Sequence, residues 1–179
     1  EICRRLITEM GMMEHIVAHS REVCRVSIFL ADHLDLFRLN RELIRAASLL
    51  HDITKTRSFE TRENHAETGA LLLADLGYPE VGRIVGQHVR LERYFSSATP
   101  TEEEIVNYAD KRVLHDRIAP LSERMGYILE KYGQAPEQKQ NILFLWRKTE
   151  ELQTRLFTTL PFAPDDLSLL LPAEGSRHA

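Results

Sequence analysis

The chain has 179 residues, of which 43% are hydrophobic and 28% charged, and its formal net charge is −4. This length suits one domain, or one domain with an extension, and the composition is that of a soluble globular protein. The negative charge argues against binding to nucleic-acid polymers or anionic membranes, but a local cationic cluster can still hold a small phosphorylated substrate.

The sequence has no apolar run of about 18 residues that would form a membrane helix, and no signal-peptide pattern. Its two cysteines, Cys3 and Cys24, lack zinc-site spacing, so we expect reduced thiols in a cytoplasmic protein. The first residue is Glu1 rather than Met, which favours a piece of a longer chain. The sequence leaves homo-oligomer formation open.

Apolar residues at three- and four-residue spacings predict an all-α protein. The expected helices span residues 13–34, 41–51, 63–76, 79–88, 101–113, 120–132 and 137–158. Gly77 has the position of a C-terminal cap, and Thr101 with Glu104 has capping-box spacing. No segment shows β-alternation. Residues 91–100 are expected to form a mobile lid beside the site, and residues 172–179 to fray.

Six nitrogen or carboxylate donors lie in the first 110 residues, each in a predicted helix or at a helix end. They are His19, His51, Asp52, His65, His88 and Asp110. The His51-Asp52 pair follows an apolar run, so both side chains should be buried, which is costly unless a partner such as a divalent metal pairs them. Each histidine alone would more often be bonded to a carbonyl, so the prediction depends on the whole set.

The remaining histidines have simpler interpretations. A second His-Asp pair, His115-Asp116, lies in a charged stretch and is expected at the surface or at the rim of the site. His15, His33 and His178 are interpreted as surface residues, and Trp146 as a packing residue.

The segment Leu49-Leu50-His51-Asp52-Ile53-Thr54-Lys55 resembles the signature of the HD-domain superfamily of metal-dependent phosphohydrolases. Further motifs of that family occur in the same order, with His19 in a helix, His65 opening His-Ala-Glu-Thr-Gly, His88 at a helix end and Asp110 in Ala-Asp-Lys. The resemblance covers roughly residues 10–120 and is closest to the two-metal, HDIG-like bacterial branch.

The resemblance implies a helical-bundle core over residues 1–133, followed by a helical extension over residues 134–179. Thr54 stands where many members have a smaller residue. Gln87 stands before His88 where some branches have a second histidine, so the resemblance does not extend to a third metal or to a signalling-dinucleotide activity.

Within this family resemblance, Asp52 is the expected bridging carboxylate of a metal pair. His19, His51 and Asp110 would complete one metal site, and His65 with His88 the other. Imidazole and carboxylate donors suit iron, manganese, zinc or nickel. Catalytic roles are expected for Asp52 and Lys55, because Lys55 lies one helical turn beyond Asp52 and can neutralise a phosphoryl group or hold the carboxylate. The expected substrate-binding cations are Lys55, Arg57, Lys111 and Arg112.

The expected function is hydrolysis of a phosphomonoester or phosphoanhydride, in a nucleotide such as a dinucleoside tetraphosphate, by a metal-activated water. Two alternatives stay open. One is a non-catalytic helical module that binds a metal or a nucleotide, and the other is a di-iron oxygenase built on the same kind of core. The ligand set alone does not separate them, because phosphohydrolase and oxygenase chemistry use the same donors.

Overall fold

The computed structural model describes residues 1–34 and 38–172, and it confirms an all-α fold. The elements in chain order are α1 (Ile2–Glu9), α2 (Glu14–His33), α3 (Arg41–Leu50), α4 (Lys55–Thr61), α5 (His65–Asp75), α6 (Pro79–Val85), α7 (Glu102–Asp110), β1 (Val113–Leu114), β2 (Arg117–Ile118), α8 (Leu121–Tyr132), α9 (Pro136–Phe157), a 3₁₀ turn (Pro164–Asp166) and α10 (Leu167–Leu170). The predictions for His178 and for the tail beyond residue 172 lie outside the described residues.

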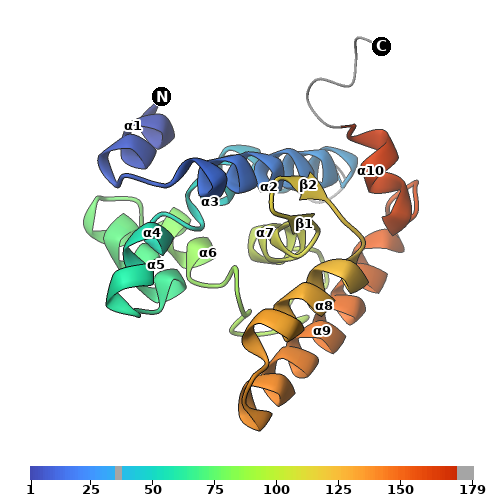
Figure 1. Ribbon diagram of the computed structural model, residues 1–179. Helices are drawn as coiled ribbons and strands as arrows, with labels where there is room; N and C mark the ends of the chain where they lie inside the picture. Colours follow the sequence, from blue (N-terminus) through green and yellow to red (C-terminus); the bar gives the residue numbers. More distant parts are fainter. Residues whose placement is uncertain (35–37, 173–179) are drawn as a thin grey trace, which may run out of the picture.

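The main core lies where α2, α3, α6 and α7 pack together (Figure 1). Its centre is aliphatic, and Val23, Leu30, Ile44, Ile84 and Ile105 are fully buried there. The helix starts follow the sequence, since Asn40, Asn64 and Thr101 accept backbone N–H groups through their side chains. Among the helices that the structure describes, none is long and apolar enough to cross a membrane.

Two glycines allow the neighbouring helices to approach closely. A Cβ atom added at Gly82 on α6 would lie 2.6 Å from the backbone oxygen of Ala70 on α5. A Cβ atom at Gly69 would lie 3.2 Å from Val85 Cγ1 and 3.3 Å from Ile53 Cγ2. Gly69 therefore lets the start of α5 lie against the turn that carries His51 and Asp52.

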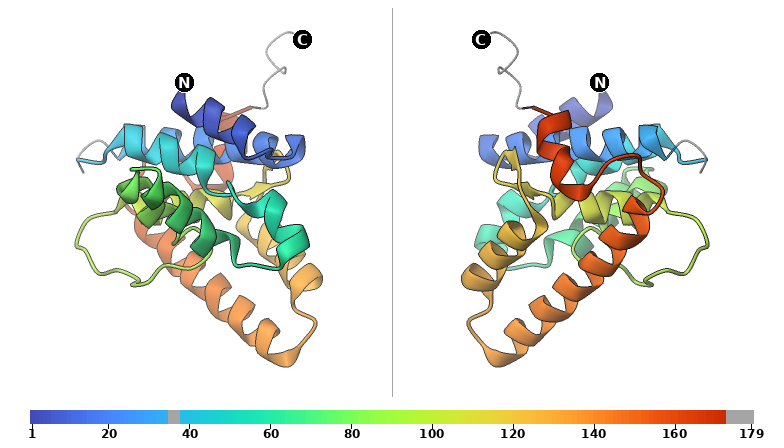
Figure 2. Two further views of the ribbon diagram at one scale, coloured as in Figure 1. Left: turned by 90° about the vertical axis from the view of Figure 1, so that its left-hand side faces the viewer. Right: turned by 90° about the vertical axis from the view of Figure 1, so that its right-hand side faces the viewer.

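Helices α8 and α9 form a hairpin that projects from the rest of the molecule (Figures 1 and 2). A small second cluster, centred on Leu121, Met125 and Ile142, holds the two helices together. The far end of α9 is anchored differently, because Leu152 and Leu156 are fully buried in the main core. The expected boundary at residue 133 thus falls in the turn between two packed helices.

The structure differs from the sequence expectation at several element boundaries. Helices α1 and α4 were not expected, α6 ends at Val85 rather than at residue 88, and α7 ends at Asp110 rather than at residue 113. A short antiparallel hairpin pairs Val113 with Ile118, although no β-structure was expected. It is too short to show alternation, and its turn places His115 at φ 58°.

The segment expected to form a lid, residues 91–100, does not lie beside the site in this structure. The structure describes this whole segment, and none of its residues lines the cavity beside the histidines. Arg155 Nη2 on α9 donates a hydrogen bond of 2.6 Å to the Ser97 carbonyl, and the Lys148 ammonium lies 5.5 Å from the centre of the Phe95 ring. Contacts with α9 therefore hold the segment away from the site.

Candidate metal centre

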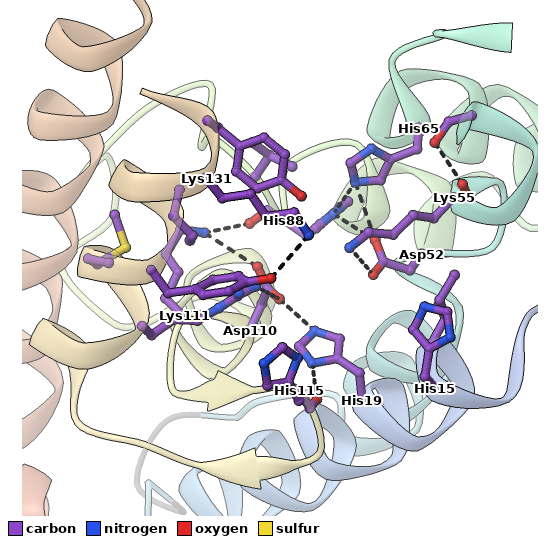
Figure 3. A pocket seen from close by; sticks show the side chains of 18 of the residues that line it. His15, His19, Asp52, Lys55, His65, His88, Asp110, Lys111, His115 and Lys131 are labelled. Atoms are coloured by element: carbon purple, nitrogen blue, oxygen red, sulfur yellow. Dashed lines mark hydrogen bonds and ion pairs between the residues drawn. The ribbon is translucent and has the colours of Figure 1, made fainter. Parts of the chain in front are cut away.

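The six predicted ligands converge on one site, although 91 residues separate His19 from Asp110. Figure 3 shows five of them, His19, Asp52, His65, His88 and Asp110. They come from five different places in the fold. His19 is on α2, His51 and Asp52 are in the turn after α3, His65 opens α5, His88 follows α6, and Asp110 ends α7. His65 is partly exposed and the other five are buried.

Backbone carbonyls fix the orientation of three of the imidazole rings. His19 Nδ1 lies 2.8 Å from the His115 carbonyl, His51 Nδ1 2.8 Å from that of Ser48, and His88 Nδ1 2.7 Å from that of Val85. A carbonyl oxygen only accepts, so each Nδ1 carries the proton and donates it. The lone pair of each neutral ring is consequently on Nε2, and this is the usual arrangement in metal-binding histidines.

These Nε2 atoms and the carboxylates form two groups. In the first, Asp110 Oδ1 lies 3.0 Å from His19 Nε2 and 3.7 Å from His51 Nε2. In the second, Asp52 Oδ1 lies 3.3 Å from His65 Nε2 and 3.4 Å from His88 Nε2. The two nitrogens of the second group are 3.2 Å apart.

Asp52 joins the two groups. Its Oδ1 atom faces His65 and His88, whereas its Oδ2 atom lies 3.4 Å from His51 Nε2 in the first group. Ligand atoms about 2.1 Å from one metal lie about 3.0 Å apart at a right angle and about 3.4 Å apart at the tetrahedral angle. Apart from the 3.7 Å between Asp110 Oδ1 and His51 Nε2, the separations in both groups match this range, so the donor set fits divalent metals.

Two buried atoms show why the site needs a cation. Among the described residues, His51 Nε2 and Asp52 Oδ1 have no hydrogen-bond partner, although their side chains are at most 1% exposed. A buried polar atom without a partner costs about 1–3 kcal/mol. Burial also lowers the pKa of His51 to about 3, which keeps its ring neutral and its lone pair free.

Both carboxylates are held in the ionised form. Burial alone would raise the pKa of Asp52, but the neighbouring His51 ring, the other imidazoles and the Lys55 ammonium outweigh it and hold that pKa well below its usual range. For Asp110, burial is likewise outweighed by His19 and by nearby cations, so its pKa is also well below the usual value. Ionised carboxylates beside neutral imidazoles are the forms that bind metals.

Two residues next to the turn that carries His51 and Asp52 hold the ligands in place. Lys55 Nζ donates a hydrogen bond of 2.7 Å to Asp52 Oδ2, in agreement with the expected contact between them. Thr54, which departs from the usual family pattern, is fully buried, and its hydroxyl donates a bond of 2.8 Å to the His65 carbonyl. Thr54 therefore ties the first residue of α5 to the turn that carries Asp52.

The other expected substrate-binding cations are occupied elsewhere. Arg112 is 2% exposed and does not line the cavity; it donates to Ala119 O, to Tyr108 Oη and to Pro164 O, so it is a structural residue. Arg57 points to Glu63, with Nε 2.7 Å from Oε1, and also lies outside the cavity lining. The expectation of phosphate binding by Arg112 is therefore wrong, and Arg57 does not face the cavity in this structure.

Lys111 lines the cavity, but its ammonium is buried and committed to backbone groups. Nζ donates to the His88 carbonyl at 2.7 Å and to the Asn107 carbonyl at 3.2 Å, and burial lowers the pKa of Lys111 to about 8. Asn107 Nδ2 donates to the same His88 carbonyl at 3.0 Å. Lys111 and Asn107 thus position His88 rather than face a substrate.

The sequence interpretation missed the residues on α8. A cavity of about 800 Å³ opens from the ligands toward the α8–α9 hairpin, and Arg124, Tyr127, Ile128 and Lys131 line its far side. His15 and the His115-Asp116 pair lie at its edge, and His115 and Asp116 are exposed as expected. The spacing 124, 127, 128, 131 places the four α8 residues on one helix face, which was the signal available in the sequence.

The sequence was compared with models of known protein families. A family model described as the HD domain matches residues 16–113, which is more than half of the chain. The chain belongs to the HD-domain family. HD domains are typically metal-dependent phosphohydrolases that bind divalent metals, and the buried histidine–aspartate groups of this HD domain fit that chemistry. Searches of curated proteins and of solved structures gave no significant match.

Proposed function

We propose that this HD domain is a two-metal phosphohydrolase that cleaves a phosphomonoester or phosphoanhydride of a small molecule, with nucleotides and dinucleoside polyphosphates as the first candidates. The observation that carries the proposal is the placement of Asp52. Its carboxylate faces His51 through Oδ2 and the His65–His88 pair through Oδ1. A carboxylate between two histidine groups is the arrangement that a metal pair requires.

The residues divide into two sets in this proposal. His19, His51 and Asp110 would hold one divalent metal, and His65 with His88 the other, with Asp52 shared. Iron, manganese, zinc and nickel all suit these donors. Bound divalent metals supply a nucleophile from water at neutral pH and neutralise phosphoryl oxygens.

The protein itself contributes orientation. The carbonyls of His115, Ser48 and Val85 keep each donor nitrogen aimed into the site. Lys55 holds Asp52 through Oδ2 and lines the cavity, so its ammonium is also within reach of a phosphoryl oxygen. These groups are in place before a substrate arrives, which lowers the cost of organising the transition state.

The test combines metal content with a substrate screen. Protein purified without chelator should contain about two transition metals per chain and should hydrolyse phosphate esters or anhydrides when Mn²⁺ is added. Asp52→Ala should lose both metals and turnover. The matched control is Asp75→Ala on α5, which removes an exposed carboxylate outside the site and should change neither quantity. Wild-type turnover in Asp52→Ala would refute the proposal.

Running the screen with and without oxygen separates this function from the two alternatives. Hydrolysis that is independent of O₂ supports the phosphohydrolase. Turnover that requires O₂ and bound iron would replace it with an oxygenase, and metal uptake without turnover of any substrate would favour a binding module.

A further inference from the structure

The cavity beside the metal ligands has two chemically different sides. Figure 3 shows Asp52, Lys55 and His65 on the right and Lys131, from α8, on the left. The side formed by α8 and α9 lies beyond residues 16–113, the segment that matches the family. A volume of about 800 Å³ is typical of sites that bind drug-sized molecules, and it leaves space beyond a single phosphoryl group.

Arg124 is a cation on this side with hydrogen-bond donors to spare. Its side chain is 13% exposed, and its Nε atom is buried without a hydrogen-bond partner among the described residues. The nearest carboxylate atom is Asp110 Oδ1, which lies 3.8 Å from Arg124 Nη2, beyond hydrogen-bond distance. Asp110 also contacts His19 at 3.0 Å, so Arg124 is not its only partner.

Two of the cavity's lysines, Lys55 and Lys111, do not offer the same capacity. Lys55 is bound to Asp52 Oδ2 at 2.7 Å, and Lys111 donates to two backbone carbonyls. A guanidinium carries five N–H groups in a planar fork that can bind two phosphoryl oxygens at once. Arg124 therefore has both the position and the free donors to bind a phosphate that reaches the metal ligands.

Apolar and aromatic side chains continue the surface beyond Arg124. Ile128, Ile142 and Leu145 line the cavity together with Tyr127. Two cations lie near the Tyr127 ring, with the Arg124 guanidinium 6.0 Å and the Lys131 ammonium 5.4 Å from its centre. A phosphate without an organic group would leave this surface in contact with water, whereas an apolar or aromatic group would bury it favourably.

We propose that the α8–α9 hairpin forms the substrate-recognition side of the site. Arg124 binds oxygens of the phosphoryl group, and the face made by Tyr127, Ile128, Ile142 and Leu145 accepts a large aromatic or apolar organic group of the same molecule. The substrates are therefore bulky organic phosphates rather than inorganic phosphates or phosphates of small polyols. The inference rests on the proposed function for the reaction, but its binding component can be measured separately.

The kinetic test uses one bulky and one small phosphate ester, 2-naphthyl phosphate and glycerol 3-phosphate, with Mn²⁺-loaded full-length protein. The wild type should prefer 2-naphthyl phosphate in kcat/KM by about 100-fold or more. Arg124→Gln should lower kcat/KM for both esters by about 100-fold, and Arg124→Lys should restore part of it. Metal content should stay at the wild-type value in both variants. The matched control is Arg117→Gln, since Arg117 is exposed, pairs with Glu123 and does not line the cavity.

A second variant tests the apolar side independently of Arg124. Leu145→Ala should reduce the preference for 2-naphthyl over glycerol phosphate by about 10-fold. Wild-type preference in Leu145→Ala, or a wild-type enzyme that prefers glycerol 3-phosphate, would overturn the assignment of the organic group to this face.

A binding measurement separates the inference from the proposed hydrolase function. Calorimetric titration of the Mn²⁺-loaded protein with 2-naphthylmethyl phosphonate, which is not hydrolysed, should show binding that Arg124→Gln weakens by about 10-fold. If the protein shows this binding but hydrolyses no phosphate ester, the inference about the recognition side is supported and the proposed hydrolase function is contradicted. Equal binding by the wild type and Arg124→Gln would overturn the inference even if hydrolysis is observed.

Discussion

Replacing Thr54 by valine should weaken one metal site and leave the other intact. The Thr54 hydroxyl donates to the His65 carbonyl at 2.8 Å and lies 3.0 Å from Thr68 Oγ1, so it connects the turn carrying Asp52 with the start of α5. Valine keeps the volume of threonine but cannot make either bond. His65 belongs only to the second ligand group, whereas His19 and Asp110 belong to the first.

The expected size follows from the hydrogen bond that is lost. Thr54 is fully buried, and a buried hydrogen bond of this kind contributes about 1–2 kcal/mol. If that energy holds His65 in its binding position, the affinity for the second metal should fall by about 5- to 30-fold. In other proteins, mutation of residues that hydrogen-bond to metal ligands lowers metal affinity by about 10- to 100-fold, so the expected loss is of the same order.

The assay is competition with a chromophoric chelator, which resolves the two metal affinities of the wild type and the variant. Thr68→Val is the matched control, because it removes the 3.0 Å partner but keeps the bond from Thr54 to His65. Its affinities should stay within about threefold of the wild type. Unchanged affinities in Thr54→Val, or an equal loss at both sites, would show that Thr54 does not position His65.

Three other predictions concern catalysis and stability. Lys55→Met should lower kcat by about 100-fold while both metals remain bound, measured by steady-state kinetics and elemental analysis; loss of metal in step with activity would assign Lys55 to holding Asp52 alone. Arg112→Met removes three buried hydrogen bonds and should lower the free energy of unfolding in urea by about 3 kcal/mol, with unchanged metal content; a change below about 1 kcal/mol would contradict its structural role. Metal removal by a chelator should lower Tm by about 5–10 °C, because binding at about 100 times Kd contributes about 2.7 kcal/mol; an unchanged Tm would mean that the ligand groups are equally stable without a cation.

The ligand set was predictable because its residues occur in local motifs that each have a structural reason. The apolar run before His51 implies burial, and Gly69, four residues after His65, permits the close contact between α5 and the signature turn. The meeting of His19 with Asp110 was not available from spacing, since it depends on how α2 packs against α7. The expectation that His19 and Asp110 share one site came from the family resemblance and not from local patterns.

It was harder to predict which lysines and arginines face the cavity, because the exposure and the partners of a side chain depend on the tertiary structure. Arg112 is next to Lys111 and close to Asp110 in the sequence, but it points into the core, where carbonyls and Tyr108 satisfy its donors. Arg124 follows no motif, and it reaches the site because one face of α8 lines the cavity. Lys55 was placed correctly because a contact within one helical turn is local.

In the function and the recognition side proposed above, chemistry and recognition are carried by different parts of this chain. All six proposed metal ligands lie within residues 16–113, and the separations of 3.0–3.7 Å between their donor atoms leave little room for change. The cavity face of α8 and α9 is supported mainly by the second cluster, which includes Leu121, Met125 and Ile142 and is distinct from the main core. Side chains on that face can therefore change without creating a void beside the metal ligands. Since Leu152 and Leu156 anchor α9 in the main core, the hairpin keeps its position while its surface varies, which is what a substrate-selecting wall requires.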